Sequence, residues 1–504
     1  MAGNTSHADV IVVGGGPAGA TAARLLATWG YRVALYTRAS ARPSLAESLP
    51  PSALHLLDRV GVLREVMAGP FVSASGNTVW WGATEERVEA FPAGTIGLQV
   101  ERSRFDEVLL EAARRVGVHV HAQASVREVR LSPDATGGAS VTYEVGGTVH
   151  EVTAPWVLDA SGRSGVIARH GFRTSPDPLR TTALAGVWER PHGWPLADWT
   201  HTTVESLTTG WIWSIPTSVE RRYVTVMLDP RATTIGGAEH MDHRYEESLA
   251  ASARHHHLLA GATRVGEIVA VDASAYGCTH AAQQGVVLLG DAASFVDPLA
   301  SFGIKKAVAS GWFGAVVVNT SFRAPSAQGA AIDLMNRWER EAANALRRGV
   351  QEFAAAAQPD TRRTGALESA SFWMPRTGGE EWTPDGALDV RALRSDPSVA
   401  LAFADLKARE AVRLRMAPEV SFAPYPVVRD NVVVLEDHLV TPTLEAGVRY
   451  LRNVDMLALA RLAEQRSRVP DILDAYNASL PPAPLADLLG ALAVLIAKGV
   501  LRHA

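Results

Sequence analysis

Short apolar runs separated by amphipathic stretches dominate the first part of the chain. Asp9–Val13 reads DVIVV, residues 20–30 show helical spacing with Leu25 and Leu26 on the apolar side, and Tyr31–Tyr36 forms a second run. Short unbroken apolar runs are typical of strands that are buried on both faces, as in a parallel sheet covered by helices. The pattern therefore predicts an α/β fold with a parallel sheet.

The periodicity changes in the middle of the chain, between about residues 178 and 275. Apolar residues there recur at alternate positions in short runs, which is typical of half-buried strands. The expected strands are 180–187, 202–207, 210–214 and 222–227. They predict an inserted antiparallel sheet. The helical stretch 246–259 contains three consecutive histidines, which cannot share one helix face, so we expect a solvated helix there and no metal site.

The last third of the chain has a mainly helical pattern. Residues 330–357 form a long amphipathic stretch, with Arg and Glu on one face. Further on, two strand-like runs precede three helical ones: 431–435, 447–451, 456–465, 469–476 and 484–500. This order predicts a small C-terminal module. It is similar to a winged helix, and peptide recognition is one interpretation; a structural or dimerising helical cap is the other.

Composition excludes several classes of protein. The 504 residues are 47% apolar and 20% charged, as in globular domains. A net charge of −5 argues against nucleic acid as the main partner, because phosphate binding needs a basic surface. Cys278 is the single cysteine, which excludes a disulfide framework and a cysteine-based metal centre. No apolar run suits a membrane span and no signal peptide is evident, so we expect a cytoplasmic protein without metal.

A glycine-rich turn, GGGPAG, links the first strand to the first helix. Gly14 permits the tight turn, Gly16 lets the backbone approach a pyrophosphate, and Gly19 allows the helix to pack closely on the strand. Pro17 and Ala18 start the helix, whose N-terminus faces the phosphates. The motif predicts a Rossmann-type dinucleotide site.

The second strand departs from the usual dinucleotide pattern. The acid that normally contacts the ribose hydroxyls is replaced by Thr37, which is followed by Arg38. We expect adenosine binding to be weak or to use another contact, for which Arg38 is the candidate.

Three downstream segments resemble the large FAD-dependent monooxygenases of the p-hydroxybenzoate hydroxylase type. Residues 157–163, VLDASGR, resemble the strand and turn that close the nucleotide site. Residues 286–293 end in the Gly-Asp pair that meets the flavin ribityl chain in that family, and residues 99–106 resemble the segment that lays Gln and Arg against the cofactor. The resemblance implies FAD contacts from Gln99, Arg102, Asp159, Gly290 and Asp291.

Two further motifs are similar to those of the flavin-dependent halogenases and their near relatives. Residues 295–303 fit F-x-x-P-x-x-S-x-G, which lines the flavin and the tunnel leading from it in that family. The resemblance, which covers about residues 9–330, implies cofactor contacts from Pro298, Ser301 and Gly303.

The second motif is W-x-W-x-I-P, which residues 211–216 fit. In the halogenase family this motif is proposed to keep substrate away from the flavin, which implies that Trp211 and Trp213 lie beside the substrate. The alternative is that both tryptophans simply occupy one face of a half-buried strand, since they are two positions apart.

The chain lacks the lysine on which halogenation in this family depends. That lysine engages the hypohalous acid, and its position in the matching segment, residues 71–82, is taken by Ala74. The chain has four lysines in all, and none precedes Lys305. We expect Lys305 or Lys306 to face solvent or the flavin phosphates, with a replacement catalytic role as the weaker alternative.

Glu47 is the best candidate for a catalytic base. It begins the segment ESLPP, which resembles a family motif that borders the flavin and the active site. The alternative is a structural role at the start of the following helix. Trp80 and Trp81 are candidates for the lining of the substrate cavity.

The sequence therefore predicts a two-component FAD-dependent monooxygenase that uses reduced flavin and O₂ to hydroxylate an aromatic or heteroaromatic ring. The ring is free, carrier-bound or part of a peptide, and a separate NAD(P)H-dependent flavin reductase supplies the reduced flavin. Two alternatives remain open: a flavin-dependent halogenase with an atypical active site, and a flavoprotein maturation partner that binds a protein or peptide.

The expected fold is an α/β, Rossmann-type FAD-binding domain with an inserted antiparallel substrate sheet and a mainly helical C-terminal region. The expected domains are residues 1–177 with 276–330 for FAD, 178–275 for substrate, 331–424 as a helical extension and 425–504 as the C-terminal module.

Overall fold

The computed structural model forms two compact units, Met1–Glu380 and Glu381–Ala504. The residues that the structure describes are 8–38, 45–82, 85–132, 138–174, 179–230, 237–300, 302–357, 372, 393, 396–452 and 454–504.

A six-stranded sheet forms the centre of the larger unit, in the order β18-β19-β12-β1-β2-β8. Five strands are parallel, and β18 runs antiparallel to β19. The strands are β1 (Val10–Val13), β2 (Val33–Thr37), β8 (His119–Ala122), β12 (Trp156–Asp159), β18 (Ala282–Gln283) and β19 (Val286–Leu288). All four residues of β1 are buried, as the apolar run predicts. The predicted α/β fold is confirmed.

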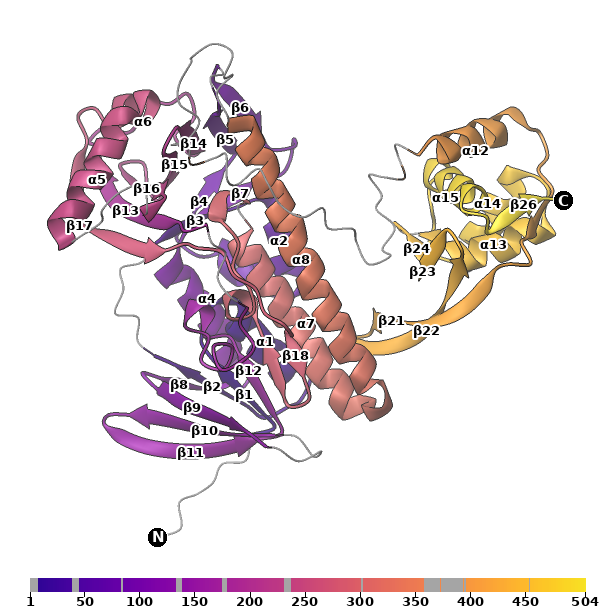
Figure 1. The fold of residues 1–504 in the computed structure, drawn as a ribbon, viewed down its shortest axis with the longest axis horizontal. Helices are drawn as coiled ribbons and strands as arrows, with labels where there is room; N and C mark the ends of the chain where they lie inside the picture. The colour runs from indigo at the N-terminus through magenta and orange to yellow at the C-terminus, as the bar shows by residue number, and fades with distance from the viewer. Residues whose placement is uncertain are drawn as a thin grey trace, which may run out of the picture. The chain divides into compact units, whose positions relative to one another are not determined.

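Helices pack against this sheet and against one another (Figure 1). They are α1 (Pro17–Thr28), α2 (Pro51–Arg59), α3 (Leu63–Met67), α4 (Arg102–Arg115), α7 (Gly303–Arg323) and α8 (Gln328–Ala357). Helix α7 crosses α1 so closely that a methyl group at Gly311 would lie 2.4 Å from the carbonyl oxygen of Ala18. Helix α8 runs beside α7. None of the helices in the described ranges is long and apolar enough to cross a membrane.

Two small sheets lie beside the six-stranded sheet and its helices. One is the antiparallel meander of β9 (Ser125–Leu131), β10 (Ala139–Val145) and β11 (Thr148–Ala154). The other pairs β7 (Gly97–Glu101) with β3 (Ala46–Leu49) and β4 (Val72–Ala74). Because α4 begins at Arg102, directly after β7, the second small sheet brings Glu47 of β3 close to the first residue of α4.

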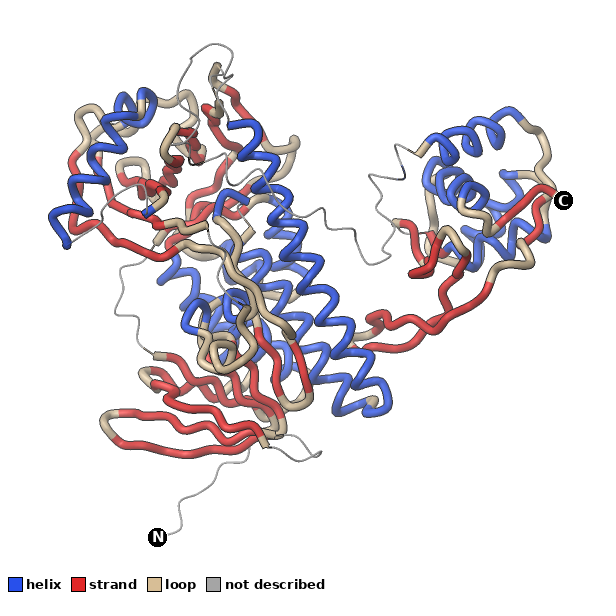
Figure 2. Tube along the Cα trace, in the orientation of Figure 1, coloured by secondary structure: helices blue, strands red, loops and turns tan. Residues whose placement is uncertain are grey.

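The predicted substrate sheet has seven strands, in the order β17-β13-β16-β15-β14-β5-β6. Strands of this sheet are among the red segments at the upper left of Figure 2. Its strands are β5 (Gly76–Trp80), β6 (Arg87–Ala90), β13 (Thr182–Glu189), β14 (Thr202–Leu207), β15 (Gly210–Pro216), β16 (Arg221–Leu228) and β17 (Thr263–Asp272). It differs from the prediction, because β5 and β6 join it from outside the insert. Strand β5 pairs with β14 in parallel, so the sheet is mixed and not wholly antiparallel.

Helices α5 (Gly237–Ala251) and α6 (Ala253–Leu258) cover one face of this sheet. The expectation of a single solvated helix is wrong here. Ser252 separates the two helices and caps α6 through its hydroxyl. His255 is fully buried, and its Nδ1 lies 2.8 Å from the Glu205 carboxylate on β14, whereas His256 and His257 are exposed.

The C-terminal unit has a core of its own. Its elements are α12 (Pro397–Ala408), β20 (Leu414–Met416), β21 (Ser421–Arg429), β22 (Val432–Thr441), β23 (Leu444–Val448), β24 (Tyr450–Leu451), β25 (Val454–Asp455), α13 (Met456–Gln465), α14 (Val469–Ser479), α15 (Leu485–Ala497) and β26 (Leu501–His503). The unit starts earlier than residue 425, because Leu406 of α12 and Leu414 of β20 are buried in the same core as α13 and α15. Residues 331–357 belong to the larger unit through α8.

Candidate active site

The turn between β1 and α1 has the tight geometry that its glycines predict. Gly14 has φ +110°, and a methyl group there would lie 2.2 Å from the carbonyl oxygen of Ala160. A methyl group at Gly19 would lie 2.0 Å from the carbonyl oxygen of Gly14. Gly16 precedes Pro17, the first residue of α1. A methyl group at Gly16 would lie 4.0 Å from its nearest neighbours, so the space over this glycine is open. An open helix N-terminus of this kind is suited to a pyrophosphate.

A cavity of about 330 Å³ continues from this turn to the seven-stranded sheet. Gly16, Pro17 and Ala18 line one end, and Trp213, Thr225 and Met227 of the sheet line the other. Further lining residues come from β3, the start of α4, the turn after β12, and the segment between β19 and α7. The cavity therefore joins the nucleotide-binding turn to the predicted substrate sheet.

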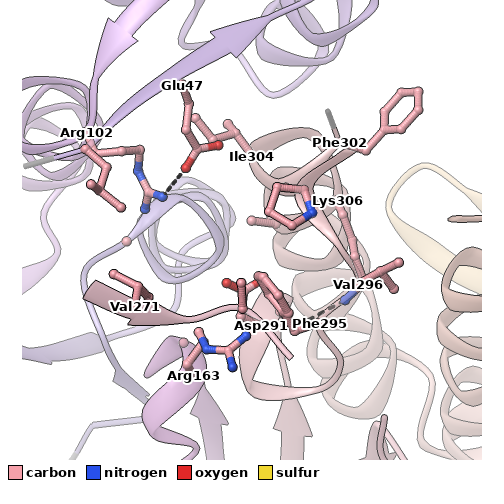
Figure 3. A pocket seen from close by; sticks show the side chains of 18 of the residues that line it. Glu47, Arg102, Arg163, Val271, Asp291, Phe295, Val296, Phe302, Ile304 and Lys306 are labelled. Atoms are coloured by element: carbon pink, nitrogen blue, oxygen red, sulfur yellow. Dashed lines mark hydrogen bonds and ion pairs between the residues drawn. The ribbon is translucent and has the colours of Figure 1, made fainter. Parts of the chain in front are cut away.

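Glu47 and Arg102 line one side of the cavity (Figure 3), and Arg102 also pairs with Asp106 on α4. The Arg102 guanidinium donates to Glu47 Oε1 at 2.5 Å and to both oxygens of Asp106 at 3.1 Å. Burial acts to lower the pKa of Arg102, but Glu47 and Asp106 together raise it, so Arg102 stays charged. Arg102 is thus committed to two carboxylates.

Burial also raises the pKa of the Glu47 carboxyl above its usual value. Arg102 opposes this shift, whereas the carboxylates of Asp291 and Asp106 reinforce it. Glu47 Oε2 would lie 3.6 Å from a methyl group at Gly303, the first residue of α7. A carboxylate with a raised pKa in a cavity has the properties of a general base.

The turn after β19 brings the predicted Gly-Asp pair to the cavity wall. Gly290 has φ +57° and donates its N–H to Ser310 Oγ of α7 at 2.8 Å. Asp291 lines the cavity, and its carbonyl oxygen accepts from the hydroxyl of Tyr276 at 2.6 Å. Pro298 and Gly303 line the same wall. Ser301, the remaining predicted contact in this segment, lies outside the described residues.

Two residues predicted to contact the cofactor have other partners. The Asp159 carboxylate is fully buried and accepts from the backbone N–H of Ser161, Ile167 and Ala168, at 3.0, 2.7 and 3.0 Å, and from the Ser161 hydroxyl at 2.6 Å. It organises the turn after β12 instead of facing the cavity. The buried amide of Gln99 donates to the Thr200 carbonyl oxygen and the Thr202 hydroxyl, both at 3.0 Å. Neither side chain is part of the cavity wall.

Arg163, from the same turn, was missed by the sequence analysis. It lines the cavity, and its guanidinium stacks 4.1 Å from the centroid of the Phe295 ring. Its Nη2 lies 3.3 Å from the Ser274 carbonyl oxygen. The VLDASGR motif contains this arginine, but its reach into the cavity depends on Phe295, which is distant in sequence.

Arg38 lies at the end of β2 and outside the cavity wall. Its guanidinium donates to the Ser164 hydroxyl at 3.1 Å. Thr37, which replaces the usual acid, packs against Gly15 at the glycine turn. A contact from Arg38 to an adenosine remains a prediction.

The four predicted substrate tryptophans separate into two groups. Trp213 lines the cavity, and the buried Trp211 meets it edge to face, with ring centroids 5.4 Å apart. Trp80 instead packs against His255 and donates to Glu86 at 3.2 Å. Trp81 donates to the Phe353 carbonyl oxygen of α8 at 2.9 Å. Of the four, only Trp213 is among the residues that line the cavity, and a substrate contact from the other three stays a prediction.

The position of the missing lysine is buried, and the lysines after it are bound elsewhere. Ala74 of β4 is 1% exposed. Lys305 Nζ donates to Ser52 Oγ at 3.1 Å and lies 5.0 Å from the Phe302 ring centroid. Lys306 borders the cavity, but its Nζ is paired with Glu339 at 2.8 Å. In the described part of the chain, no group of three His, Cys, Asp or Glu side chains could hold a metal ion.

Comparison with known proteins agrees with this geometry. Residues 7–312 match the family model described as the FAD binding domain. The chain belongs to this family of FAD-dependent oxidoreductases. It is 29% identical over 326 residues to the tryptophan 2-halogenase of Chondromyces crocatus, an alignment that covers 62% of each chain. The chain thus spans less than two thirds of that relative.

Solved structures extend the likeness to the whole chain. The flavin-dependent halogenase CmlS is 24% identical with a TM-score of 0.75, covering 99% of this chain and 96% of CmlS. The peptidyl tryptophan dihydroxylase QhpG is also 24% identical, with a TM-score of 0.65 and coverage of 93% and 95%. Both share the fold. The cofactor of this superfamily is FAD, and O₂ is the typical oxidant of its enzymes.

Proposed function

We propose that this protein is an FAD-dependent monooxygenase that hydroxylates an aromatic or heteroaromatic ring. One observation supports the proposal. Among the described residues, the lysine that lines the cavity, Lys306, already has three partners for its ammonium group, so none is available to bind hypohalous acid. Ala74 stands where the halogenase lysine would be, and Lys306 is bound to Glu339 and to two carbonyl oxygens. Without an available amine, the site has no group to engage hypohalous acid. Oxygen transfer needs no such group.

In this proposal, the glycine turn and Asp291 hold the cofactor. Gly14, Gly16 and Gly19 leave space for the pyrophosphate at the N-terminus of α1, and the Asp291 carboxylate suits the ribityl hydroxyls. When bound and reduced, FAD supplies the electrons that activate O₂ for transfer of one oxygen atom. We infer that a separate NAD(P)H-dependent reductase delivers the reduced flavin.

The sheet end of the cavity suits an aromatic substrate. Trp213, Met227 and Phe295 give it an apolar wall, which excludes water and offers rings on which another ring can stack. An indole has the matching chemistry, since both the tryptophan 2-halogenase and the peptidyl tryptophan dihydroxylase named above act on tryptophan. The indole is free, carrier-bound or part of a peptide.

Glu47 acts as the base in this account. Arg102 holds Oε1 at 2.5 Å, which orients the carboxylate, and the raised pKa makes it a better proton acceptor. Taking a proton from a ring N–H or O–H makes the ring a stronger nucleophile, which favours attack on an electrophilic oxygen.

The C-terminal unit supports the peptide-bound form of the substrate, or a role as a maturation partner. It is a separate unit with its own core, and the residues that line the cavity belong to the larger unit. A chain ending at Glu380 separates the two ideas. Hydroxylation of free indole by this shorter chain would support an enzyme with an added recognition module, and its loss would favour the partner role.

A reconstituted assay tests the proposed reaction. The protein is combined with a flavin reductase, NADH, FAD and a probe panel of indole, L-tryptophan and a tryptophan-containing peptide, with and without chloride or bromide. The expected product carries one added oxygen and forms at the same rate without halide. A halogen-bearing product would contradict the proposal.

A further inference from the structure

A buried ion pair joins α7 and α8 behind the turn that carries Asp291. Lys306 Nζ lies 2.8 Å from Glu339 Oε1, and the two side chains are 7% and 3% exposed. The sequence analysis expected one of Lys305 and Lys306 to face solvent or the flavin phosphates; Lys306 has a partner 33 positions further along the chain.

The same ammonium group holds the turn at both ends. Lys306 Nζ donates to the Gly290 carbonyl oxygen at 3.1 Å and to the Ser294 carbonyl oxygen at 2.9 Å. With Glu339, this makes three partners, which is the full donor capacity of an ammonium group. Glu339 Oε1 also accepts from the Ser294 hydroxyl at 2.5 Å. Both ends of the 290–294 turn are therefore tied to one buried charge pair.

We propose that Lys306 and Glu339 are positioning residues of the cofactor site. They hold the 290–294 turn in the conformation that presents Asp291 to the cavity. A buried charge pair contributes little net stability compared with apolar side chains, because desolvation offsets the attraction. Its effect is to fix the conformation of the turn, since the carbonyl oxygens of Gly290 and Ser294 both accept from the Lys306 ammonium group. The inference concerns cofactor binding, so it holds whether the enzyme hydroxylates or halogenates.

The discriminating variant replaces both members of the pair by apolar side chains of similar size, K306M with E339L. We expect the purified protein to fold, because no charge is left buried alone. We expect its Kd for FAD to rise about tenfold, the effect of losing one or two net hydrogen bonds that order the turn. The visible spectrum of bound FAD should also shift, because the carboxylate of Asp291 moves.

Two further variants keep the test decisive. S294A removes the hydroxyl that bridges Glu339 to the turn and leaves the charge pair intact; we expect a smaller rise in the Kd for FAD, about threefold. K305M is the matched control, since Lys305 neighbours Lys306 on α7 but contacts Ser52 and Phe302 instead. It should bind FAD as the wild type does.

Titration of each apoprotein with FAD, followed by flavin fluorescence, gives the comparison. Wild-type Kd and spectrum in the folded double variant would overturn the proposal and leave the pair a purely structural feature. If the double variant does not fold, S294A decides: an unchanged Kd would overturn the proposal, and a raised Kd supports it.

Discussion

Glu47 and Arg102 meet across two elements that the small β3–β7 sheet brings together, with the Arg102 guanidinium 2.5 Å from Glu47 Oε1. If Arg102 moved, the carboxylates of Glu47 and Asp106 would both lose the hydrogen bonds that it donates to them. The pair therefore fixes the direction of the one carboxylate that we assign as a base. It also makes Glu47 the first residue to test.

Glu47→Gln keeps the size and polarity of the side chain and removes the proton acceptor. We expect the rate of hydroxylation to fall by about 10²-fold or more, the usual contribution of a general base, with binding of FAD largely retained. Steady-state rates and FAD titration measure the two effects. Glu107→Gln, on the exposed side of α4, is the control and should have no effect. A wild-type rate in Glu47→Gln would remove Glu47 from the mechanism.

The pH profile gives an independent test of the same residue. The carboxylate is the active form, and burial raises its pKa above the ordinary value of 4.5. The wild-type rate should therefore rise with pH through this raised pKa, and the step should be absent from the residual activity of Glu47→Gln. A profile with the same step in both proteins would assign it to another group.

Trp211 and Trp213 lie on the same strand, and we expect the first to matter for stability and the second for the reaction. Trp211 is buried and outside the cavity wall, so Trp211→Ala should destabilise the fold by about 3–5 kcal/mol in denaturant unfolding. Trp213 lines the cavity, so Trp213→Ala should cost less stability but admit water. We expect it to raise the ratio of hydrogen peroxide to hydroxylated product several-fold. If the ratio of hydrogen peroxide to hydroxylated product is the same in the wild type and in Trp213→Ala, the substrate does not bind beside Trp213.

Because Thr37 stands where an acid usually contacts the ribose, we expect weak binding of the adenosine half of the cofactor. The end of β2 usually carries an acid that bonds to the ribose hydroxyls. Thr37→Glu restores that acceptor, and we expect the Kd for FAD to fall about tenfold, as for one or two added hydrogen bonds. Calorimetric titration of FAD measures this, with Thr37→Gln as the uncharged control. An unchanged Kd in Thr37→Glu would mean that the ribose is bound by other groups.

His255 predicts acid sensitivity of the substrate sheet. Burial lowers the pKa of His255 below its ordinary value of 6.5, so the unfolded chain takes up its proton at a higher pH than the folded one. The contribution of the neutral, buried His255 to the free energy of unfolding is therefore fully present above pH 6.5 and is lost as the pH falls below that value. Urea unfolding at about pH 7.5 and about pH 5.5 should show this loss, and His255→Gln should reduce it. The exposed His256→Gln is the matched control; equal losses in all three proteins would refute the assignment.

Features set by local sequence could be predicted. The apolar run of β1 and the spacing of Gly14 and Gly19 follow from short-range sterics, so they predict the parallel sheet and the nucleotide turn. The alternation predicts four strands of the substrate sheet, β13 to β16, but it does not predict β17. The recruitment of β5 and β6 was not predicted either, because it depends on pairing with β14, far along the chain.

Side-chain roles were harder to predict, because a motif states which residue is present but not what it touches. Asp159 stands in the expected motif, yet four nearby donors take up its carboxylate. His255 and Lys306 were assigned by their neighbours in sequence, whereas Glu205 and Glu339, distant in the chain, determine their environment. Buried charge pairs of this kind become visible only when the helices and strands are packed.

The most direct test of the account is the origin of the new atom in the product. The reconstituted enzyme is given isotopically labelled O₂ and indole, in buffer with bromide and in buffer free of halide, and the product mass is measured. The account predicts one labelled oxygen atom per product, in equal yield in both buffers. A brominated product, formed only when bromide is present, would contradict it and would mean that a site without an uncommitted lysine can still direct hypohalous acid.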